Sequence, residues 1–493
     1  MAISLYEKLN NTPYDNEIAL SEGDKTLTFS ELKERVRTFA NNLRSLGVKS
    51  GDVVTVCLPN VIEAVIAFYG TNASGCIANM VHPSLPSLML KEIQESTHSS
   101  LLIGLYQHKS INKKITCRSK VAVKNSWDNF ISLSSPTIEY KKKSSTAVYL
   151  HSGGTTDKPK TIVLSDDNFN ALSDGLFDMF QENEARGYRA LTTLPMFHGF
   201  GLGAGVHAML NLGVELVLVP KFDKSTTPDL VLDKKINMIL GVPLIFSAIL
   251  NSPKIQQTKD LSFVKNCYVG GDNIPHELTL RFNELLKSKK SSALLCEGYG
   301  LTECVSVCAV NRNDHYKAGS IGLPLKGVEL AILSENGDFS SDECIGEICV
   351  SGDIVMQRYL SRQNKCFMEK EGKRWLKTGD FGYRDADGFY YFVERKKRIV
   401  KISGVTVFPS EVEMILHTHH GVRDVFVKPT SKENQKLKAF VVKNTGTKVN
   451  EAELLDYCRA HLMKWAVPES IVFLSSLPLT PIGKIDKKSE IFN

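Results

Sequence analysis

A segment rich in glycine, hydroxyl and lysine side chains has the composition of a phosphate-binding loop, and it follows the apolar run 147–150. Backbone N–H groups left accessible by glycine, together with hydroxyl and ammonium groups, can surround phosphate oxygens. No Gly-Lys-Ser/Thr closes the loop, which excludes a Walker A motif. The same composition is typical of a plain surface turn. The residues that could bind phosphate are Ser152, Gly153, Gly154, Thr155, Thr156 and Lys160.

Four further segments carry side chains suited to a polyanionic ligand. Lys484 follows Gly483 and two nearby prolines, which predicts a held loop rather than a helix face. Taken alone, Lys484 is an ordinary exposed lysine. The other three segments are Tyr299-Gly300-Leu301-Thr302-Glu303, Leu376-Lys377-Thr378-Gly379-Asp380 and Glu394-Arg395-Lys396-Lys397-Arg398.

Length and composition restrict the class of protein. A chain of 493 residues is too long for one simple core, so at least two domains are expected. With 42% apolar and 23% charged residues, the composition is that of a globular protein. The net charge of +6 is small for this length and does not argue for nucleic-acid binding. Eleven cysteines without a Cys-x-x-Cys pair point to a reducing compartment.

Targeting and membrane signals are not evident in the sequence. The N-terminus lacks the charged-then-apolar layout of a signal peptide. The longest apolar stretch, 236–250, is broken by Asn237, Gly241 and Pro243, so no membrane span is expected. A cytoplasmic protein is predicted.

Hydrophobic periodicity predicts alternating helices and strands in the first two thirds of the chain. Ser30 is expected to cap a helix that ends near Gly47, followed by a strand at 53–58 and an apolar helix at about 61–75. The same alternation continues through a helix near 203–212, which favours layered α/β subdomains.

After about Ser320, short strands separated by glycines favour a small antiparallel or barrel-like subdomain. The charged segment 394–401 then precedes a compact α+β tail of about 95 residues.

The five motifs, in this order, resemble those of the adenylate-forming superfamily, which includes acyl-CoA synthetases, aryl-CoA ligases, luciferases and peptide-synthetase adenylation domains. The resemblance extends from about Thr28 to Lys487. It implies a large N-terminal adenylation core at 1–394, a hinge at 395–400 and a mobile C-terminal domain at 401–493.

The family reaction joins a carboxylate to the α-phosphate of ATP, releases pyrophosphate, and then transfers the acyl group to a thiol or amine. By resemblance, the loop 152–160 holds the β- and γ-phosphates. Tyr299 and Gly300 meet adenine, Thr302 donates to the α-phosphate, and Glu303 binds Mg²⁺. A single carboxylate suits Mg²⁺, which takes its other ligands from phosphates and water.

The resemblance also assigns the ribose and the hinge. Asp380 would accept both ribose hydroxyls, because its two oxygens match a vicinal diol. Arg395 would contact ribose or phosphate, and Lys397 stands at the hinge position. In one pose Lys484 would bridge the α-phosphate and the carboxylate. In the other pose, the segment with Ser403 and Gly404 would line a thiol tunnel.

The acyl pocket is expected beside the segment Leu194–Gly201. By resemblance, His198 or the adjacent aromatic residues gate the carboxylate, although a core histidine is the alternative. By resemblance, the pair Phe222-Asp223 follows a strand as in acyl synthetases and does not mark α-amino recognition, so a fatty or aryl carboxylate is favoured. The expected pocket residues are His198, Phe200, Gly201, Val242 and Gly270, and Gly271 and Asp272 are expected to meet adenine as well.

Several functions share these motifs. The leading interpretation is an acid–thiol ligase that uses ATP, Mg²⁺ and CoA. The alternative within the class is an acyl-AMP ligase that loads an acyl or peptidyl carrier protein. A luciferase-like oxygenase has the same motifs. Gly153 and Asp157 depart from the family pattern, and an acidic side chain beside phosphates is unfavourable. They motivate a third interpretation, a degenerate binder of nucleotide or acyl-adenylate.

Overall fold

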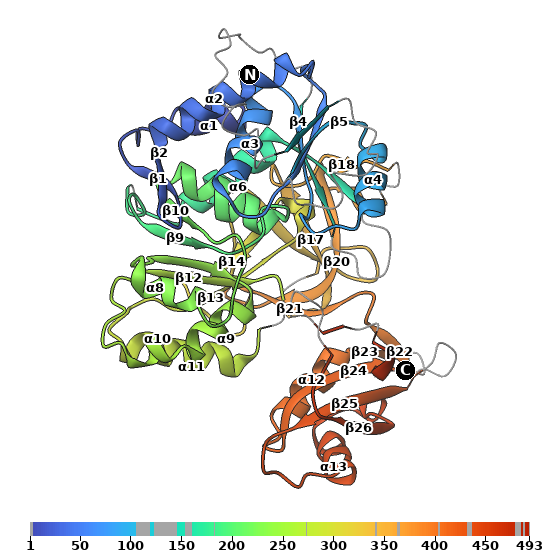
Figure 1. The fold of residues 1–493 in the computed structure, drawn as a ribbon. Coiled ribbons are helices and arrows are strands. Elements are labelled where there is room, and N and C mark those ends of the chain that lie inside the picture. The colour runs from blue at the N-terminus through green and yellow to red at the C-terminus, as the bar shows by residue number, and fades with distance from the viewer. Residues whose placement is uncertain are drawn as a thin grey trace. The chain divides into compact units, whose positions relative to one another are not determined.

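The chain forms two compact units (Figure 1). Unit 1 comprises Met1–Leu330 and Val350–Leu376, and unit 2 comprises Ala331–Cys349 and Lys377–Asn493. The computed structural model describes residues 3–104, 119–122, 145–152, 160–181, 183–272, 274–340, 343–361, 365–402, 405–430, 436–478, 485–486 and 489–492.

A nine-stranded sheet in unit 1 has the order β15-β14-β13-β12-β11-β9-β10-β1-β2. Its strands from β13 to β1 run parallel to their neighbours, whereas β14, β15 and β2 pair antiparallel at the edges. Strands β10 and β11 are buried throughout, as expected for a parallel sheet covered on both faces. The bounds are β1 Ile18–Glu22, β2 Lys25–Thr28, β9 Arg189–Thr192, β10 Glu215–Leu218, β11 Met238–Gly241, β12 Asn266–Gly270, β13 Leu295–Gly300, β14 Val307–Val310 and β15 Leu323–Pro324.

A second sheet of seven strands has the order β18-β8-β7-β4-β3-β5-β6. The chain pairs antiparallel from β7 to β8 and from β8 to β18, so the loop 152–160 connects two adjacent strands. The predicted strand at 53–58 is confirmed as β3. The bounds are β3 Val53–Cys57, β4 Ile77–Met80, β5 Ser99–Gly104, β6 Ser119–Ala122, β7 Thr146–His151, β8 Thr161–Ser165 and β18 Arg358–Tyr359.

Helices accompany these strands, and the predicted helix at about 61–75 is confirmed as α3. No helix in the described part of the chain is long and apolar enough to cross a membrane. The bounds are α1 Leu5–Asn10, α2 Phe29–Ser45, α3 Ile62–Ala73, α4 Ser87–Ser96, α6 Asp166–Phe177, α7 Met209–Asn211, α8 Leu230–Asp233, α9 Pro243–Asn251, α10 Pro253–Gln257 and α11 His276–Ser288, with 3₁₀ turns at Thr227–Asp229 and Thr302–Cys304.

The start of α2 corrects one prediction. Thr28, not Ser30, caps this helix, and its hydroxyl accepts a hydrogen bond from the Glu31 N–H. The Glu31 carboxylate accepts in return from the Thr28 N–H at 2.8 Å. Only Thr28 has a glutamate three residues later, which completes a reciprocal capping box.

The predicted helix near 203–212 is found, but most of it is a π-helix at Phe200–Ala208, continued by α7. Its glycines allow close approach to a neighbouring turn. A Cβ at Gly203 would lie 2.6 Å from Val305 Cγ1, and one at Gly199 would lie 1.5 Å from the Val305 carbonyl oxygen. This non-local contact cannot be read from helical periodicity, which is the reason that the helix type was not predicted. Wide helical turns of this kind are frequent at functional sites.

A five-stranded sheet lies where short glycine-separated strands were predicted. Its order is β16-β17-β20-β19, with β21 paired to β20. The boundaries between unit 1 and unit 2 fall inside three of these strands, β16, β17 and β20. The bounds are β16 Val328–Leu333, β17 Gly346–Gly352, β19 Phe367–Lys370, β20 Lys373–Arg384 and β21 Tyr390–Arg395.

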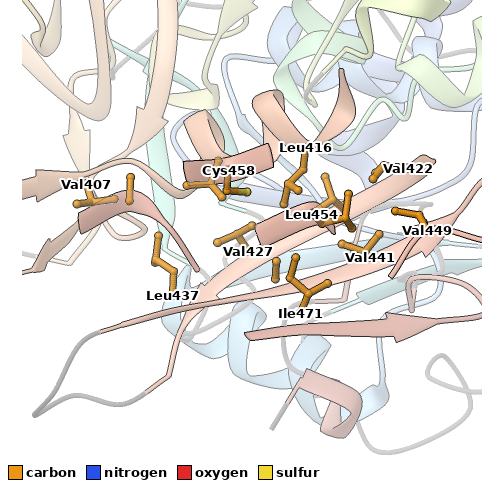
Figure 2. Close-up of a cluster of buried hydrophobic side chains, with 14 of the residues drawn as sticks. Val407, Leu416, Val422, Val427, Leu437, Val441, Val449, Leu454, Cys458 and Ile471 are labelled. Atoms are coloured by element: carbon orange, nitrogen blue, oxygen red, sulfur yellow. The ribbon is translucent and has the colours of Figure 1, made fainter. Parts of the chain in front are cut away.

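The last part of unit 2 is the predicted α+β fold. Figure 2 shows its apolar core, in which Leu416 of α12 and Leu454 of α13 face Val427 and Val441 of the sheet. The three-stranded sheet has the order β24-β25-β26, and β22 and β23 form a separate pair. The bounds are β22 Val400–Ile402, β23 Val405–Val407, α12 Pro409–His417, β24 Val422–Pro429, β25 Leu437–Lys443, α13 Glu451–His461 and β26 Ser470–Leu474, with 3₁₀ turns at Lys464–Ala466 and Glu490–Phe492. The mixed α/β fold class is thus confirmed.

Candidate active site

The base of the predicted phosphate loop is closed by backbone hydrogen bonds. The Ser152 N–H donates to the Lys160 carbonyl at 2.9 Å, and the Lys160 N–H donates to Ser152 Oγ at 3.0 Å. The strand pair β7–β8 therefore fixes where the loop begins and ends. The loop residues Gly153, Gly154, Thr155, Thr156 and Asp157 lie outside the described residues, so their roles stay predictions.

His151, the residue before the loop, was not singled out from the sequence. Its Nε2 lies 2.7 Å from Asn79 Oδ1, and its Nδ1 lies 3.3 Å from Thr161 Oγ1. Burial lowers the pKa of His151 to about 4, so the imidazole is neutral at neutral pH. A neutral ring that joins β4, β7 and β8 stiffens the loop base without adding charge. The sequence signal that could have identified His151 is a polar residue at the end of an otherwise apolar strand.

The segment Tyr299–Glu303 leaves the end of β13 and enters a 3₁₀ turn. Gly300 is required here, because a Cβ would lie 1.8 Å from the Ser306 carbonyl oxygen. Tyr299 is 8% exposed. Val305 follows the turn with φ 60°, a conformation that β-branched residues rarely adopt. Such local strain is often found at functional sites.

Glu303 is held by a tyrosine that the sequence analysis did not single out. The hydroxyl of Tyr359 donates to Glu303 Oε1 at 2.7 Å, and the Met356 N–H donates to the Glu303 carbonyl at 2.7 Å. Lys160 Nζ lies 4.9 Å from the centre of the Tyr359 ring. Burial, followed by the charge of Glu303, raises the pKa of Tyr359, so the phenol keeps its proton and donates. Two of the predicted residues, Lys160 and Glu303, therefore meet around Tyr359.

The residues expected at the acyl pocket also come together in unit 1. A Cβ at Gly270 would lie 3.8 Å from Phe200 Cε1, and one at Gly271 would lie 3.6 Å from Val242 Cγ1. Gly201 cannot carry a side chain, because a Cβ would lie 2.1 Å from the Pro195 carbonyl oxygen. The three segments that carry Phe200, Val242 and Gly270–Gly271 are thus in close contact.

His198 belongs to an aromatic cluster next to the π-helix. The Phe197 ring lies 4.6 Å from the His198 ring and 4.4 Å from the His82 ring, between ring centres. The sequence analysis did not include His82. His198 therefore packs among aromatic side chains. The role of His198 at a carboxylate stays a prediction. Asp272 is exposed beside Gly271.

In unit 2, the two residues predicted to bind ribose are direct neighbours. Asp380 on β20 pairs in register with Arg395 on β21, and Arg395 Nε lies 3.4 Å from Asp380 Oδ1. The Asp380 N–H donates to Thr378 Oγ1 at 3.0 Å, after Gly379 turns the chain with φ 76°. The arrangement presents a mostly buried carboxylate whose orientation is fixed by the turn.

The predicted hinge residue Lys397 is exposed, but ion pairs hold the residues on either side of it. Lys396 pairs with Glu347 at 2.7 Å, and Arg398 pairs with Glu413 at 2.7 Å. The side chain of Glu394, only 2% exposed, accepts from the backbone N–H groups of Arg395 and of Ser410, the latter on α12. Glu347 and Glu413 lie 49 and 15 residues from Lys396 and Arg398 in the sequence and were not predicted as their partners. Ser403, Gly404 and Lys484 lie outside the described residues.

Comparison with known proteins identifies the family. The family model described as "AMP-binding enzyme" matches residues 5–360, and "AMP-binding enzyme C-terminal domain" matches residues 411–484. A long-chain-fatty-acid–CoA ligase from Bacillus subtilis (strain 168) is 31% identical over 519 aligned positions, which cover 96% of this chain and 91% of that protein.

Solved structures with the same fold cover the whole chain. The AMP complex of o-succinylbenzoate coenzyme A synthetase from Bacillus subtilis is 27% identical, with a TM-score of 0.82 and coverage of 99% of this chain and 98% of that one. ATP-bound MatB from Rhodopseudomonas palustris has a TM-score of 0.90 at 22% identity and covers 100% of both chains, which shows a shared fold.

The chain therefore belongs to the AMP-binding enzyme family, and the resemblance inferred from its motifs is confirmed. It is an AMP-forming acid–thiol ligase, which uses ATP to activate a carboxylic acid and transfers the acyl group to CoA.

Proposed function

We propose that the protein activates a long-chain fatty acid and transfers it to CoA, with Mg²⁺ as the metal ion. The proposed binding of ATP and Mg²⁺ rests on one observation in unit 1. Tyr359 contacts both Lys160 and Glu303. The fatty acid is favoured by the 31% identity to a long-chain-fatty-acid–CoA ligase. An aryl acid is the alternative, since o-succinylbenzoate is the substrate named for one similar structure.

Glu303 fits a Mg²⁺ site by the chemistry of its donor atoms. It offers carboxylate oxygens, which Mg²⁺ prefers, and a single protein carboxylate is sufficient when phosphates supply other ligands. Bound there, Mg²⁺ would neutralise charge on the phosphate oxygens. Lys160 adds a positive charge on the same side, next to the base of the loop.

The remaining residues of this chain position the reactants. Tyr299 would stack on adenine, Thr302 would donate to the α-phosphate, and Asp380 would accept the ribose hydroxyls. Lys484 would bring its ammonium to the α-phosphate and the carboxylate. No covalent bond to the protein is needed, because positioning and electrostatic stabilisation are sufficient for phosphoryl chemistry.

The C-terminal part of unit 2 would serve two half-reactions by rotating about Lys397. Adenylation would use Lys484, and thiol transfer would use the segment with Ser403 and Gly404. The domain limits 1–394, 395–400 and 401–493 remain part of this proposal. A short charged connection between folded parts is compatible with such a motion.

Thioester formation tests the proposed substrate. The purified protein is incubated with ATP, Mg²⁺, CoA and a panel of long-chain fatty, medium-chain fatty, aryl and amino acids, and acyl-CoA is measured by mass spectrometry. Long-chain acyl-CoA as the main product is expected. Aryl-CoA as the main product would replace the fatty acid by the aryl alternative.

Two further outcomes would contradict the proposal. Acyl-adenylate that accumulates with CoA and is consumed only by a carrier protein would identify an acyl-AMP ligase. Nucleotide binding without product from any acid would identify a degenerate binder and would direct attention to Gly153 and Asp157.

A further inference from the structure

Tyr359 connects two regions of unit 1 that lie far apart in the sequence. Its hydroxyl donates to Glu303 Oε1 at 2.7 Å across a separation of 56 residues. Glu303 Oε2 receives no hydrogen bond from any residue that the structure describes. One carboxylate oxygen is therefore held by Tyr359, and ligand binding through the second oxygen would be a separate role of the same carboxylate. A carboxylate accepts several hydrogen bonds or metal contacts, so the two roles are compatible.

The backbone around Tyr359 is held on both sides. In β18, Tyr359 pairs in register with Ile162 of β8, and the Leu360 N–H donates to the Thr161 carbonyl at 2.9 Å. The Met356 N–H donates to the Glu303 carbonyl at 2.7 Å. The segment is thus bonded to the strand that leaves the phosphate loop and to the turn that carries Glu303.

The ring of Tyr359 also faces the cation of the loop base. Lys160 Nζ lies 4.9 Å from the ring centre, within the range of a cation–π contact. One side chain therefore contacts the proposed metal ligand through its hydroxyl and the proposed phosphate lysine through its ring. A phenylalanine would keep the second contact and lose the first.

We propose that Tyr359 is a positioning residue that orients Glu303 for Mg²⁺ bound with ATP. The proposal rests on the proposed function, in which Glu303 binds the metal ion. Groups that hydrogen-bond to a metal ligand fix its orientation, and their loss typically weakens metal binding by about 10- to 100-fold. The simpler explanation is that Tyr359 is a buried tyrosine whose hydroxyl needs a partner.

The two explanations predict different metal affinities for a protein without the Tyr359 hydroxyl. We would substitute Tyr359→Phe and measure Mn²⁺ binding by electron paramagnetic resonance, in the presence of a non-hydrolysable ATP analogue. About tenfold weaker Mn²⁺ binding is expected, since a single hydrogen bond to the ligand is lost. Affinity for the analogue without divalent metal is expected to change less than about twofold, because the cation–π contact with Lys160 remains.

Tyr391→Phe is the matched control. Its hydroxyl also donates to a carboxylate, Asp385 Oδ2, at 3.0 Å, but Tyr391 lies near the start of β21 and neither Tyr391 nor Asp385 is a proposed ligand-binding residue. This variant loses the same kind of hydrogen bond and is expected to bind Mn²⁺ as the wild type does. Thermal unfolding of both variants separates metal affinity from loss of fold.

A double-mutant cycle with Glu303→Gln makes the test independent of stability. If Tyr359 acts through Glu303, adding Tyr359→Phe to Glu303→Gln causes no further loss of Mn²⁺ affinity. Equal losses in both backgrounds would overturn the proposal, as would unchanged Mn²⁺ affinity in Tyr359→Phe. If the wild-type protein binds Mn²⁺ with the analogue but forms no acyl-CoA, the proposed function is refuted. The test of Tyr359 is not affected by that result.

Discussion

Two carboxylates, one in each unit, are held by opposite kinds of partner. Glu303 accepts from the neutral phenol of Tyr359 at 2.7 Å. Glu394 accepts from two backbone N–H groups and lies 3.5 Å from the guanidinium of Arg398. A neutral donor leaves the negative charge of Glu303 to attract a cation, whereas Arg398 already compensates Glu394. Under the proposed function, the same functional group serves a ligand in unit 1 and the structure in unit 2.

The largest expected effect comes from Glu303. Glu303→Gln removes a charge that no cation among the described residues pairs with, and pyrophosphate release is expected to fall by about 10²-fold, the usual cost of one lost charge-stabilising group in an active site. Initial rates at saturating ATP and fatty acid measure this. Glu329→Gln is the control, because Glu329 forms an exposed pair with Lys373 and is expected to keep full activity. Equal activity of both variants would remove the distinction between the two carboxylates.

Arg398 tests the structural side of the comparison. Arg398→Ala leaves Glu394 and Glu413 without their shared cation, and removal of one partner from a buried ion pair costs about 3 kcal/mol or more. Hydrogen exchange of β24 and β25 reports the loss of stability in unit 2. Arg281→Ala removes an exposed pair with Glu277 and is expected to cost about 0.5 kcal/mol or less. A similar small cost for Arg398→Ala would contradict the structural role.

Glu297 shows a third situation, in which burial alone acts on the carboxyl. Burial raises its pKa from 4.5 to about 7, so its contribution to stability is fully present below about pH 4.5 and is lost as the pH rises through about 7. Glu297→Gln is expected to remove this pH-dependent loss, which is about 2 kcal/mol because partial exposure screens part of the shift. Urea unfolding of both proteins across this pH range measures the difference. Parallel pH profiles for the two proteins would show that Glu297 is solvated.

Loss of the helix cap at Thr28 in unit 1 is expected to have the smallest effect on stability, and the other stability changes can be compared with it. Thr28→Ala is expected to lower the free energy of unfolding by about 1 kcal/mol, because an N-cap hydroxyl is lost. Ser30→Ala, two residues later, is expected to change it by less than about 0.5 kcal/mol. Thermal unfolding measures both. The opposite ranking would restore Ser30 as the cap.

Local patterns in the sequence predict much of the fold. Apolar runs such as 53–58 and 238–240 become buried strands, because a short continuous apolar run suits a parallel sheet covered on both faces. The resemblance assigns Asp380 and Arg395 to the ribose end of one ligand, and the structure places them on adjacent strands as direct partners, although Arg395 was expected in the connection between domains. These features depend on residues close together in sequence or on the family pattern.

Contacts between distant segments could not be predicted. The π-helix at Phe200–Ala208 depends on the approach of Val305, and Tyr359 lies on a two-residue strand with no periodicity to detect. The acidic partners of the hinge, such as Glu413, come from segments without motifs. In each case tertiary packing, rather than local propensity, determines the structure.

Pyrophosphate exchange into ATP, measured with a long-chain fatty acid and without CoA, tests most directly whether the protein adenylates its substrate as proposed. The wild type is expected to show acid-dependent exchange. Lys484→Ala is expected to reduce the exchange by about 10²-fold or more, since one aimed positive charge is lost. Exchange by Lys484→Ala at the wild-type rate, or no acid-dependent exchange by the wild type, would contradict the proposed mechanism.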